Sequence, residues 1–469
     1  MKPVRPTSAS PWTRMLNRRD ILKLGAVLAG GGAVAPLLTA CSGPTGSRAA
    51  PVGTSAGGSP PPLSGPITLL TEGGDPTTQP TLKKVYDGFA AQNPGIDWDI
   101  RAPAGASPEW DRLARALLES GEPVGLILID GQFVRAWARD GLLADLAADP
   151  AMADVLARVP RRFQFPGPGG TIWAFPLAAS MGVQTTGLYY NKAILDRAGL
   201  EAPRTLADLT AMVKPLAAMG VAPLVHCSGD AVFNPLLVTW LLPMIAEGTG
   251  DPLAFAESTI RGDIRYDSPE WIEAFRIIAD LRTSGVLLRG SGATDYGTMQ
   301  QLMLQGKAAM TCNGSWMLTQ ILAGTPSGAF DLHVAPLPLV PGATKARPIL
   351  AWGGFALPAQ AARSRDSVHA FLEYASRPEV DRAVVAGLQA YSSIAASNDA
   401  IQNAVAQEFL PMFEDAITPM DWLWEPEITT EVGNQVQALV KGDTDPAAVG
   451  KAIQAVAEEL RSSGRSYYP

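Results

Sequence analysis

The chain has 469 residues, enough for two or three domains or for one bilobal unit with a large core. Apolar residues make up 47% of it and charged residues 17%, which is an ordinary globular composition and excludes wholesale disorder. The net charge is −8, and because the first 40 residues carry +5, the remainder carries −13 and repels phosphate backbones. We therefore expect no nucleic-acid partner.

The first forty residues have the pattern of an export signal. The segment 17–23, NRRDILK, resembles the twin-arginine motif, in which an Arg pair precedes an apolar residue, Leu and Lys. The Gly-rich apolar run 24–38 is shorter than the ~20 residues of a membrane helix but suits a secretory signal. It leads into LTAC at 38–41, which resembles a lipobox. We expect a twin-arginine lipoprotein signal peptide over 1–40 and lipid attachment at Cys41.

A tether follows the signal. Residues 41–65 are mostly Gly, Ser and Pro and have almost nothing to bury, a composition typical of a flexible linker. Beyond residue 40 no apolar run reaches the ~20 residues that span a bilayer. The mature protein is therefore expected outside the cytoplasm, anchored by lipid to the outer face of the cell membrane. The alternative is a soluble chain with an incidental Arg pair and a buried cysteine.

The remaining cysteines and the histidines offer little chemistry. Cys227 and Cys312 each end a predicted buried strand, and two buried free thiols are the simplest interpretation. A disulfide is permitted outside the cytoplasm and stays open, because it needs the two strands to lie side by side. The three histidines are scattered, and no CxxC, HExxH, Gly-x-Ser-x-Gly or P-loop motif is present. We expect no metal and no cofactor.

The first part of the body alternates strands and helices. The run 124–130 is continuously apolar and closes on Asp130, as a strand buried on both faces of a parallel sheet does. The βαβαβ order predicts a doubly wound α/β lobe, whose ligands lie at the carboxyl ends of the strands. The predicted strands are 66–70, 96–100 and 124–130, and the predicted helices are 78–92 and 108–119.

A second series follows and predicts a second α/β lobe. Its strand 308–312 runs directly into Asn313-Gly314-Ser315-Trp316. We find no internal repeat. The predicted strands are 187–190, 222–227 and 308–312, and the predicted helices are 192–198, 205–219, 233–246, 269–284 and 294–305.

Several segments, in order, resemble the extracellular solute-binding proteins of carbohydrate ABC transporters, the family 1 group that contains maltose-binding protein. Each segment alone is a weak signal, but five in order with fitting spacing, from about residue 66 to 462, are a strong one. They are TIWAFP at 171–176 followed by GLYYNKAIL at 187–195 as one segment, AGLEAPRT at 198–205, GKAAM with NGSW at 306–316, WGGF at 352–355 before a helix at 364–375, and DWLW at 421–424 before helices at 427–440 and 445–460.

This resemblance implies a periplasmic-binding-protein-like fold: two doubly wound α/β lobes around a ligand cleft, joined by a multi-segment hinge. Lobe 1 is expected over 66–177 and 337–375, and lobe 2 over 178–336 and 376–469. The implied function is an extracytoplasmic substrate-binding lipoprotein that captures a sugar or small oligosaccharide and delivers it to the permease subunits of an ABC importer. The implied protein is a monomer and not an enzyme.

A sugar has an apolar face of C–H bonds and a rim of hydroxyls, so aromatic faces and carboxylates are the side chains that hold it. Trp316 follows a strand, where the family places a stacking aromatic. In extended backbone, Trp422 and Trp424 would face one side, one as a stacking wall and the other packed inside. The predicted ligand residues are Glu72, Asp75, Asp130, Ser228, Asp230, Trp316, Gly353, Gly354, Phe355, Trp422 and Trp424.

Each of these residues also has a plainer structural interpretation. Asp130 would cap a helix that begins near Gln132, and Glu72 or Asp75 would be a turn residue. The stretch 177–186 is longer than expected and lacks the acid that some relatives carry, so Ser180, Gln184 or Thr185 would replace it.

Two rival functions remain at this stage. A secreted glycoside hydrolase also uses aromatic platforms, but it needs two opposed carboxylates, and Glu72, Asp75 and Asp130 all fall in one lobe. A binding protein for another solute, such as a peptide or a glycerol phosphate diester, is the other rival, although no Arg or Lys for a phosphate stands near the motif residues. The sequence identifies neither the sugar nor the permease.

Overall fold

The computed structural model describes residues 63–72, 74–103, 108–180, 182–247, 250–318, 321, 330–360, 363–417 and 419–466. The predicted signal peptide, the lipidation site Cys41 and the tether up to residue 62 lie outside this part of the chain. No helix within the described residues is long and apolar enough to cross a membrane.

The first lobe is built on a sheet with the order β2-β1-β3-β9. Strand β1 pairs in parallel with β2 on one side and with β3 on the other, and β9 runs antiparallel to β3. Strand β3 is buried along its apolar run, as its sequence predicts. The strands are β1 (Ser64–Thr71), β2 (Gly95–Arg101), β3 (Val124–Asp130), β4 (Ala174–Phe175), which pairs with β9, and β9 (Leu350–Ala356).

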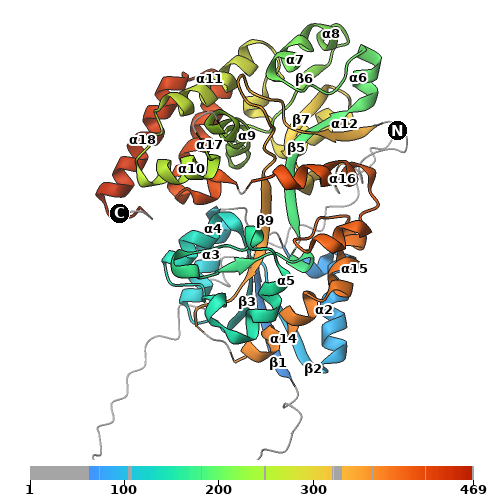
Figure 1. Cartoon of the computed structure of the whole chain (residues 1–469), viewed down its shortest axis with the longest axis vertical. Helices are drawn as coiled ribbons and strands as arrows, with labels where there is room; N and C mark the ends of the chain where they lie inside the picture. Colours follow the sequence, from blue (N-terminus) through green and yellow to red (C-terminus); the bar gives the residue numbers. More distant parts are fainter. Residues whose placement is uncertain are drawn as a thin grey trace, which may run out of the picture. The chain divides into compact units, whose positions relative to one another are not determined.

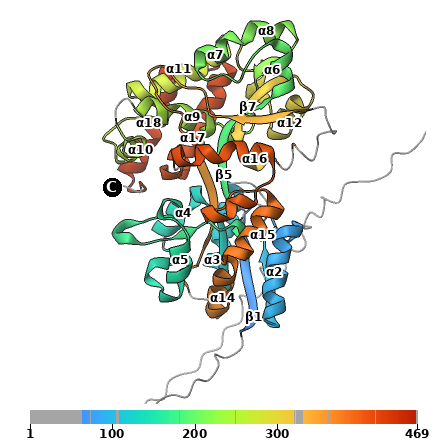
Figure 2. The same cartoon turned by 45° about the vertical axis from the view of Figure 1, so that its right-hand side comes forward.

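Helices cover this sheet and contribute to one continuous apolar core. They are α2 (Pro80–Gln92), α3 (Pro108–Glu119), α4 (Gly131–Arg139), α5 (Ala153–Arg158), α14 (Arg365–Ala375) and α15 (Pro378–Leu388). Helix α15 contacts α2 (Figure 2), and its residues Val384 and Val385 are buried in the first core. The segment 378–388 therefore packs in the first lobe, although the sequence boundary at 375 placed it in the second.

The second lobe is built on strands β5, β7, β6 and β8. The middle strand β7 is buried along its whole length and pairs antiparallel with β5 and parallel with β6. The strands are β5 (Val183–Asn191), β6 (Ala222–Leu224), β7 (Ala308–Gly314) and β8 (Leu332–Ala335). Strands β5 and β7 extend beyond their predicted ends, and β6 is shorter than predicted.

The second lobe has its own helical core. The helix predicted over 205–219 is divided at Met212, because Pro215 has no N–H to donate to the carbonyl of Ala211. The helices of this lobe are α6 (Lys192–Ala198), α7 (Leu206–Ala211), α8 (Val213–Ala218), α9 (Pro235–Ala246), α10 (Pro252–Arg261), α11 (Pro269–Thr283), α12 (Tyr296–Leu304), α17 (Pro426–Lys441) and α18 (Pro446–Ser462).

Two long strands connect the lobes. Strand β9 pairs with β5 through residues 350–352 and with β3 through residues 353–356, so one strand belongs to both sheets. Strand β5 in turn begins beside β9 and ends beside β7 and β8 (Figure 1). Helix α16 (Ala404–Phe409) contacts β8 next to this crossing. The connection is therefore made of several chain segments.

The two remaining cysteines are free thiols, and both are buried. Cys227 belongs to a small cluster with Met299 and Met303, whereas Cys312 belongs to the large core of the second lobe. Burial raises the pKa of the Cys227 thiol to about 12, so it stays protonated at neutral pH. Both cysteines are packing residues in this structure.

Candidate functional site

The carboxyl ends of β1 and β3 lie side by side and place two acids together. The chain leaves β1 through α2 toward β2 and returns through α3 to β3 on the opposite side of β1, so the two strand ends form the switch point of the doubly wound sheet. Glu72 follows β1, and Asp130 is the last residue of β3. The amide of Glu72 donates to the carbonyl of Leu128, and a Glu72 carboxylate oxygen accepts from the amide of Asp130 at 3.3 Å.

The environment of these two carboxyls disfavours their charge. Burial raises the pKa of Glu72, and the neighbouring charge of Asp130 raises it further. Burial also raises the pKa of Asp130, although Oδ1 of Asp130 accepts the amide N–H of Gln132 and so caps α4. Asp130 thus fills the capping role that its sequence context suggested and remains half-buried at the strand end. The two carboxyls therefore share one strand end, and burial disfavours the charged form of both.

A third acid, which sequence reasoning did not select, joins the pair. Asp421 lies on the 3-10 helix η13 (Met420–Leu423), and burial followed by the negative charge of Asp130 raises its pKa to about 7. Helix η13 contacts α4 of the first lobe and α9 and α10 of the second. Within the described residues, no Lys or Arg forms an ion pair with Glu72, Asp130 or Asp421. The signal in the sequence was an acid inside the aromatic motif DWLW.

The extended backbone predicted for residues 421–424 is wrong, because Trp422 lies within η13. The two tryptophans consequently point into different cores. Trp422 packs against Phe165 with ring centroids 5.3 Å apart, and a Cβ on Gly131 would lie 2.7 Å from its ring. Trp424 is 2% exposed and packs on Trp271 in the second lobe. Of the two, Trp422 stays a candidate for the ligand wall.

The second lobe brings three polar residues to its strand ends, the neutral Ser228 and Trp316 and the acid Asp230. Ser228 lies four residues after β6, is fully buried, and its hydroxyl has no hydrogen-bond partner among the described residues. Asp230 accepts the amide N–H of Tyr296 at 2.7 Å and so stabilises the start of α12. Trp316 follows β7 on the 3-10 helix η10 (Ser315–Met317) and is half-buried. Trp316 is the predicted aromatic that keeps accessible surface here.

Three predicted ligand residues lie inside β9. Gly353 pairs with Asp130, and a Cβ on Gly354 would lie 2.9 Å from the carbonyl oxygen of Phe175. Phe355 has no exposed surface and packs on Phe371 with ring centroids 6.0 Å apart. Glycine at these two positions allows β4 and β3 to approach β9 closely. Phe355 is a core residue and not part of the candidate site.

The remaining candidates have local structural partners. Asp75 accepts the amide N–H and the hydroxyl of Thr77 and caps a short 3-10 helix. The hydroxyl of Ser180 is buried and bonds to the backbone of Leu177. Gln184 accepts the hydroxyl of Ser315 at 2.7 Å. The long stretch after Pro176 therefore forms a short 3-10 helix and the beginning of β5.

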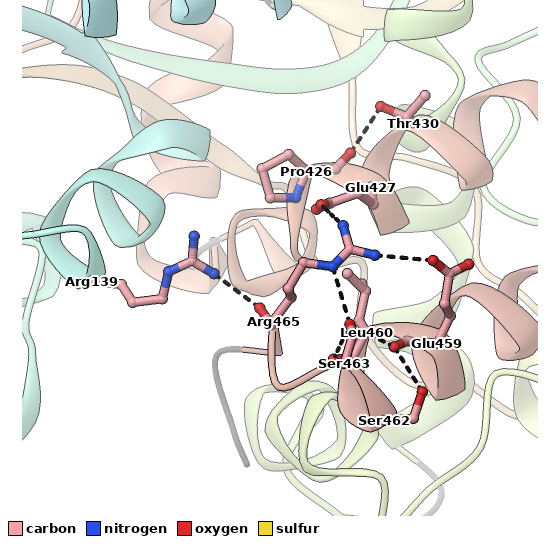
Figure 3. Close-up of polar contacts among 9 residues, drawn as sticks. All are labelled: Arg139, Pro426, Glu427, Thr430, Glu459, Leu460, Ser462, Ser463 and Arg465. Atoms are coloured by element: carbon pink, nitrogen blue, oxygen red, sulfur yellow. Dashed lines mark hydrogen bonds and ion pairs between the residues drawn. The ribbon is translucent and has the colours of Figure 1, made fainter.

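The lobes also meet through the end of the C-terminal helix (Figure 3). Nη1 of Arg139, at the end of α4, donates to the carbonyl of Arg465 at 3.0 Å. The guanidinium of Arg465 bonds in turn to Glu427 and Glu459. These side chains are about half exposed, so solvent weakens each ion pair. The contact links the lobes on the same side as η13.

A cavity of about 740 Å³ lies away from these strand ends. Its walls are apolar and include Leu195, Leu337 and Met412, with Lys192 and Arg204 among its charged residues. It contains none of the predicted ligand residues. We place the candidate site at the strand ends because Glu72, Asp130 and Asp421, whose charge burial disfavours, lie together there. Among the described residues no group of three or more His, Cys, Asp or Glu is arranged to hold a metal ion.

The sequence of the chain also matches a known protein family. The model of the family described as "Bacterial extracellular solute-binding protein" matches residues 73–382, a range that begins one residue after Glu72 and includes Asp130.

Sequence relatives are distant. A "Probable sugar-binding periplasmic protein" of Rhizobium meliloti (strain 1021) is 28% identical over 260 residues, 54% of this chain and 58% of the relative. A protein with the same description from Brucella suis biovar 1 is 24% identical over 267 residues, and the "Maltotriose-binding protein" of Pyrococcus abyssi 22% over 267 residues. The matches thus span 52–58% of these relatives' own lengths.

Solved structures share the fold. The GacH receptor of Streptomyces glaucescens GLA.O, solved without ligand and with acarbose, superposes with a TM-score of 0.70 at 21% identity over 85% of this chain and 98% of that one. A "Chitin oligosaccharide binding protein" superposes with a TM-score of 0.71 at 19% identity over 85% and 99%. The predicted fold of two α/β lobes is confirmed.

Proposed function

Because the chain belongs to the bacterial extracellular solute-binding protein family, we propose that it captures a sugar or small oligosaccharide and hands it to the permease of an ABC importer. The family model covers 73–382, more than half of the chain. The family acts outside the cytoplasm, and its members bind solutes without transforming them, so the chain is a binding protein and not a hydrolase.

A sugar is the ligand that best fits the side chains of the candidate site. Sugar hydroxyls donate to carboxylates, and Glu72, Asp130 and Asp421 offer carboxyl oxygens that no cation of the described residues neutralises. Trp316, which is only partly buried, offers aromatic surface for the C–H face of a pyranose. The descriptions of the relatives as sugar- and maltotriose-binding proteins point to the same ligand class.

The observation that carries the proposal is the arrangement of η13. This short helix contacts α4 of the first lobe and α9 and α10 of the second, and it brings Asp421 to the strand end that carries Asp130. A ligand held by both lobes would stabilise the closed arrangement relative to an open one, because only the closed arrangement supplies all of its contacts. We infer that the lobes close on the sugar and that the closed form docks on the permease.

The export and anchoring expectations from the sequence belong to this proposal. The twin-arginine motif and the lipobox support an extracytoplasmic protein held to the outer face of the membrane by lipid on Cys41, and they lie outside the described residues. Replacing Arg18 and Arg19 by Lys should retain the precursor inside the cell, and Cys41→Ser should release the exported protein from the membrane fraction. Normal export of the Lys variant would overturn the twin-arginine assignment.

The decisive experiment is titration calorimetry with glucose, maltose, maltotriose and diacetylchitobiose, accompanied by small-angle scattering. At least one carbohydrate should bind and reduce the radius of gyration. Trp316→Ala should weaken that binding about 10- to 100-fold, since stacked aromatic anchors dominate such sites. Trp424→Phe, in the core of the second lobe, is the matched control and should bind normally. Absence of binding and of compaction across the panel would refute sugar capture.

A further inference from the structure

A histidine of β8 lies between two carboxylates, one of which belongs to α16. His333 is the second residue of β8, and its Nδ1 lies 2.5 Å from Oε1 of Glu408. Its Nε2 lies 3.2 Å from Oδ1 of Asp331, which directly precedes the strand. The second oxygen of Glu408 accepts the amide N–H of Val334 at 3.0 Å. Glu408 therefore holds β8 through both a side chain and the backbone.

The surroundings fix the ring of His333 but leave it open to solvent protons. Tyr190 pairs with His333 in the sheet and stacks on its ring, with ring centroids 5.7 Å apart. The side chains of His333 and Glu408 are 26% and 34% exposed, so the pair exchanges protons with water and is only partly screened by it. The charged groups around this stack are Glu408, Asp331, Lys192 and Asp196, of which the last two form an ion pair with each other.

Helix α16, which carries Glu408, is attached to the first lobe. The hydroxyl of Tyr391 donates to the carbonyl of Ala406 in α16 at 2.9 Å. The next residue, Ser392, donates from its hydroxyl to the buried carboxyl of Asp381 in α15 at 2.6 Å. Helix α15 in turn packs on α2 of the first lobe. These bonds make Glu408 a side chain of the first lobe, whereas His333 belongs to the second.

The contact between His333 and Glu408 therefore joins the two lobes beside the crossing strands. Figure 2 shows α16 between the lobes, next to β5. The same arrangement of the lobes also has η13 against α4 and Arg139 bonded to the carbonyl of Arg465. It is the arrangement in which Asp421 lies near Asp130 at the candidate site. A stronger bond between His333 and Glu408 consequently favours the arrangement in which that site is assembled.

Protonation of His333 changes the number of bonds that its ring can make. A neutral imidazole carries one N–H, so it donates either to Glu408 or to Asp331 but not to both. The imidazolium carries two N–H groups and donates to both carboxylates in charge-assisted bonds. The bond to Glu408 is therefore fully formed while His333 is charged and weakens as rising pH removes the proton. Histidine is the side chain that changes charge between about pH 5 and about pH 8.

We propose that His333 and Glu408 form a proton-dependent contact between the lobes, which a lower pH strengthens and which thereby tightens sugar capture. The link to the ligand rests on the proposed sugar-binding function, whereas the contact itself requires no sugar. Both side chains are positioning residues, because they act on the arrangement of the lobes and lie away from the acids of the candidate site.

The first test measures sugar affinity at two pH values. His333→Gln keeps an amide donor for Glu408 but cannot be protonated. Calorimetry with the panel sugar that binds most tightly, at about pH 5 and about pH 8, should show a gain on acidification that is about 2- to 5-fold larger in the wild-type protein than in His333→Gln. The acids of the candidate site titrate in both proteins, so the difference reports His333 alone. His369→Gln is the matched control, because His369 pairs with Asp149 inside the first lobe at 2.9 Å, and it should behave as wild type.

The second test needs no ligand. Small-angle scattering of the sugar-free protein should give a smaller radius of gyration at about pH 5 than at about pH 8 in the wild type and in His369→Gln. The difference should be lost in His333→Gln and in Glu408→Gln, which removes the negative charge that the imidazolium faces. A merely structural role of the pair would lower the unfolding temperature of both variants and leave the pH dependence of the radius unchanged.

The possible results separate this inference from the proposed function. Equal pH responses of affinity in the wild type and in His333→Gln would overturn the link to sugar capture and leave sugar capture itself intact. Equal pH responses of the radius in the wild type and in Glu408→Gln would overturn the proton-dependent contact. If the wild-type protein binds no sugar of the panel, the proposed function fails, and scattering still decides whether the contact between the lobes depends on pH.

Discussion

The strand ends of the two lobes carry opposite chemistry. The first lobe presents Glu72 and Asp130, acceptors whose charge burial disfavours, whereas the second presents Ser228 and Trp316, neutral groups without an acceptor. A sugar hydroxyl both donates and accepts, so one ligand can satisfy both surfaces. Neither lobe by itself therefore satisfies all of the hydrogen bonds of a sugar hydroxyl.

The largest expected effect is on the free energy of unfolding, and it distinguishes Trp424 from Trp316, the two tryptophans whose indole N–H groups have no acceptor among the described residues. Trp424→Ala should lower the free energy of unfolding by about 3–5 kcal/mol, because it removes a buried ring from the second core. Trp316→Ala should lower it by no more than about 1–2 kcal/mol, since that ring is only partly buried. Urea unfolding monitored by circular dichroism measures both. Equal losses would show that Trp316 is a core residue.

The second prediction concerns pH and the acids at the meeting point of the lobes. The pKa of Asp421 is raised to about 7, from about 4 in an unfolded chain, so its protonated form is favoured in the folded protein. Its contribution to stability is therefore complete below about pH 4 and is lost as pH rises through about 7. Asp421→Asn should reduce the loss of stability between pH 5 and 8 by about 1–2 kcal/mol.

Thermal unfolding at several pH values checks this expectation, with Asp443→Asn on the exposed turn after α17 as the control. An unchanged pH profile in Asp421→Asn would mean that the carboxyl is solvated and is not part of the buried acids beside Asp130.

The third prediction compares the stability contributions of two side chains: Ser228, whose hydroxyl has no partner among the described residues, and Asp75, which caps a short helix. Ser228→Ala removes a buried hydroxyl that has no partner among the described residues, so stability should be unchanged or rise by up to about 1 kcal/mol. Asp75→Ala removes a helix cap bonded to Thr77 and should lower stability by about 1 kcal/mol. Chemical denaturation of both variants measures the two changes in stability. A clear loss of stability in Ser228→Ala would reveal a partner for the Ser228 hydroxyl.

The smallest effect is expected at the contact between α4 and the end of α18. Arg139→Ala removes the bond to the carbonyl of Arg465, and its half-exposed side chain should contribute no more than about 0.5 kcal/mol to stability. Lys83→Ala, an exposed ion-pair partner within α2, serves as the control. Scattering without sugar should show Arg139→Ala slightly more open. Identical scattering profiles would assign the lobe contact to η13 alone.

Much of the first lobe was readable from local patterns. The apolar run of β3 and the amphipathic helix Pro108–Glu119 were predicted with their observed bounds, because burial on both faces and a helical period leave strong signals. The order of strands placed Glu72 and Asp130 at strand ends, and both are there. Helix α15 was assigned to the wrong side of a lobe boundary, since its packing on α2 depends on contacts between residues nearly 300 positions apart.

The family, the alternation of strands and helices and the acids at the first switch point can be predicted from the sequence, because they depend on periodicity and on neighbouring residues. Which polar groups meet depends on the three-dimensional packing. It turned Trp422 and Trp424 into separate cores, buried Phe355, and brought Asp421 to Asp130 across 291 positions of the chain. Local patterns cannot specify such pairs, since burial and neighbouring charge are set by the packing of the whole fold.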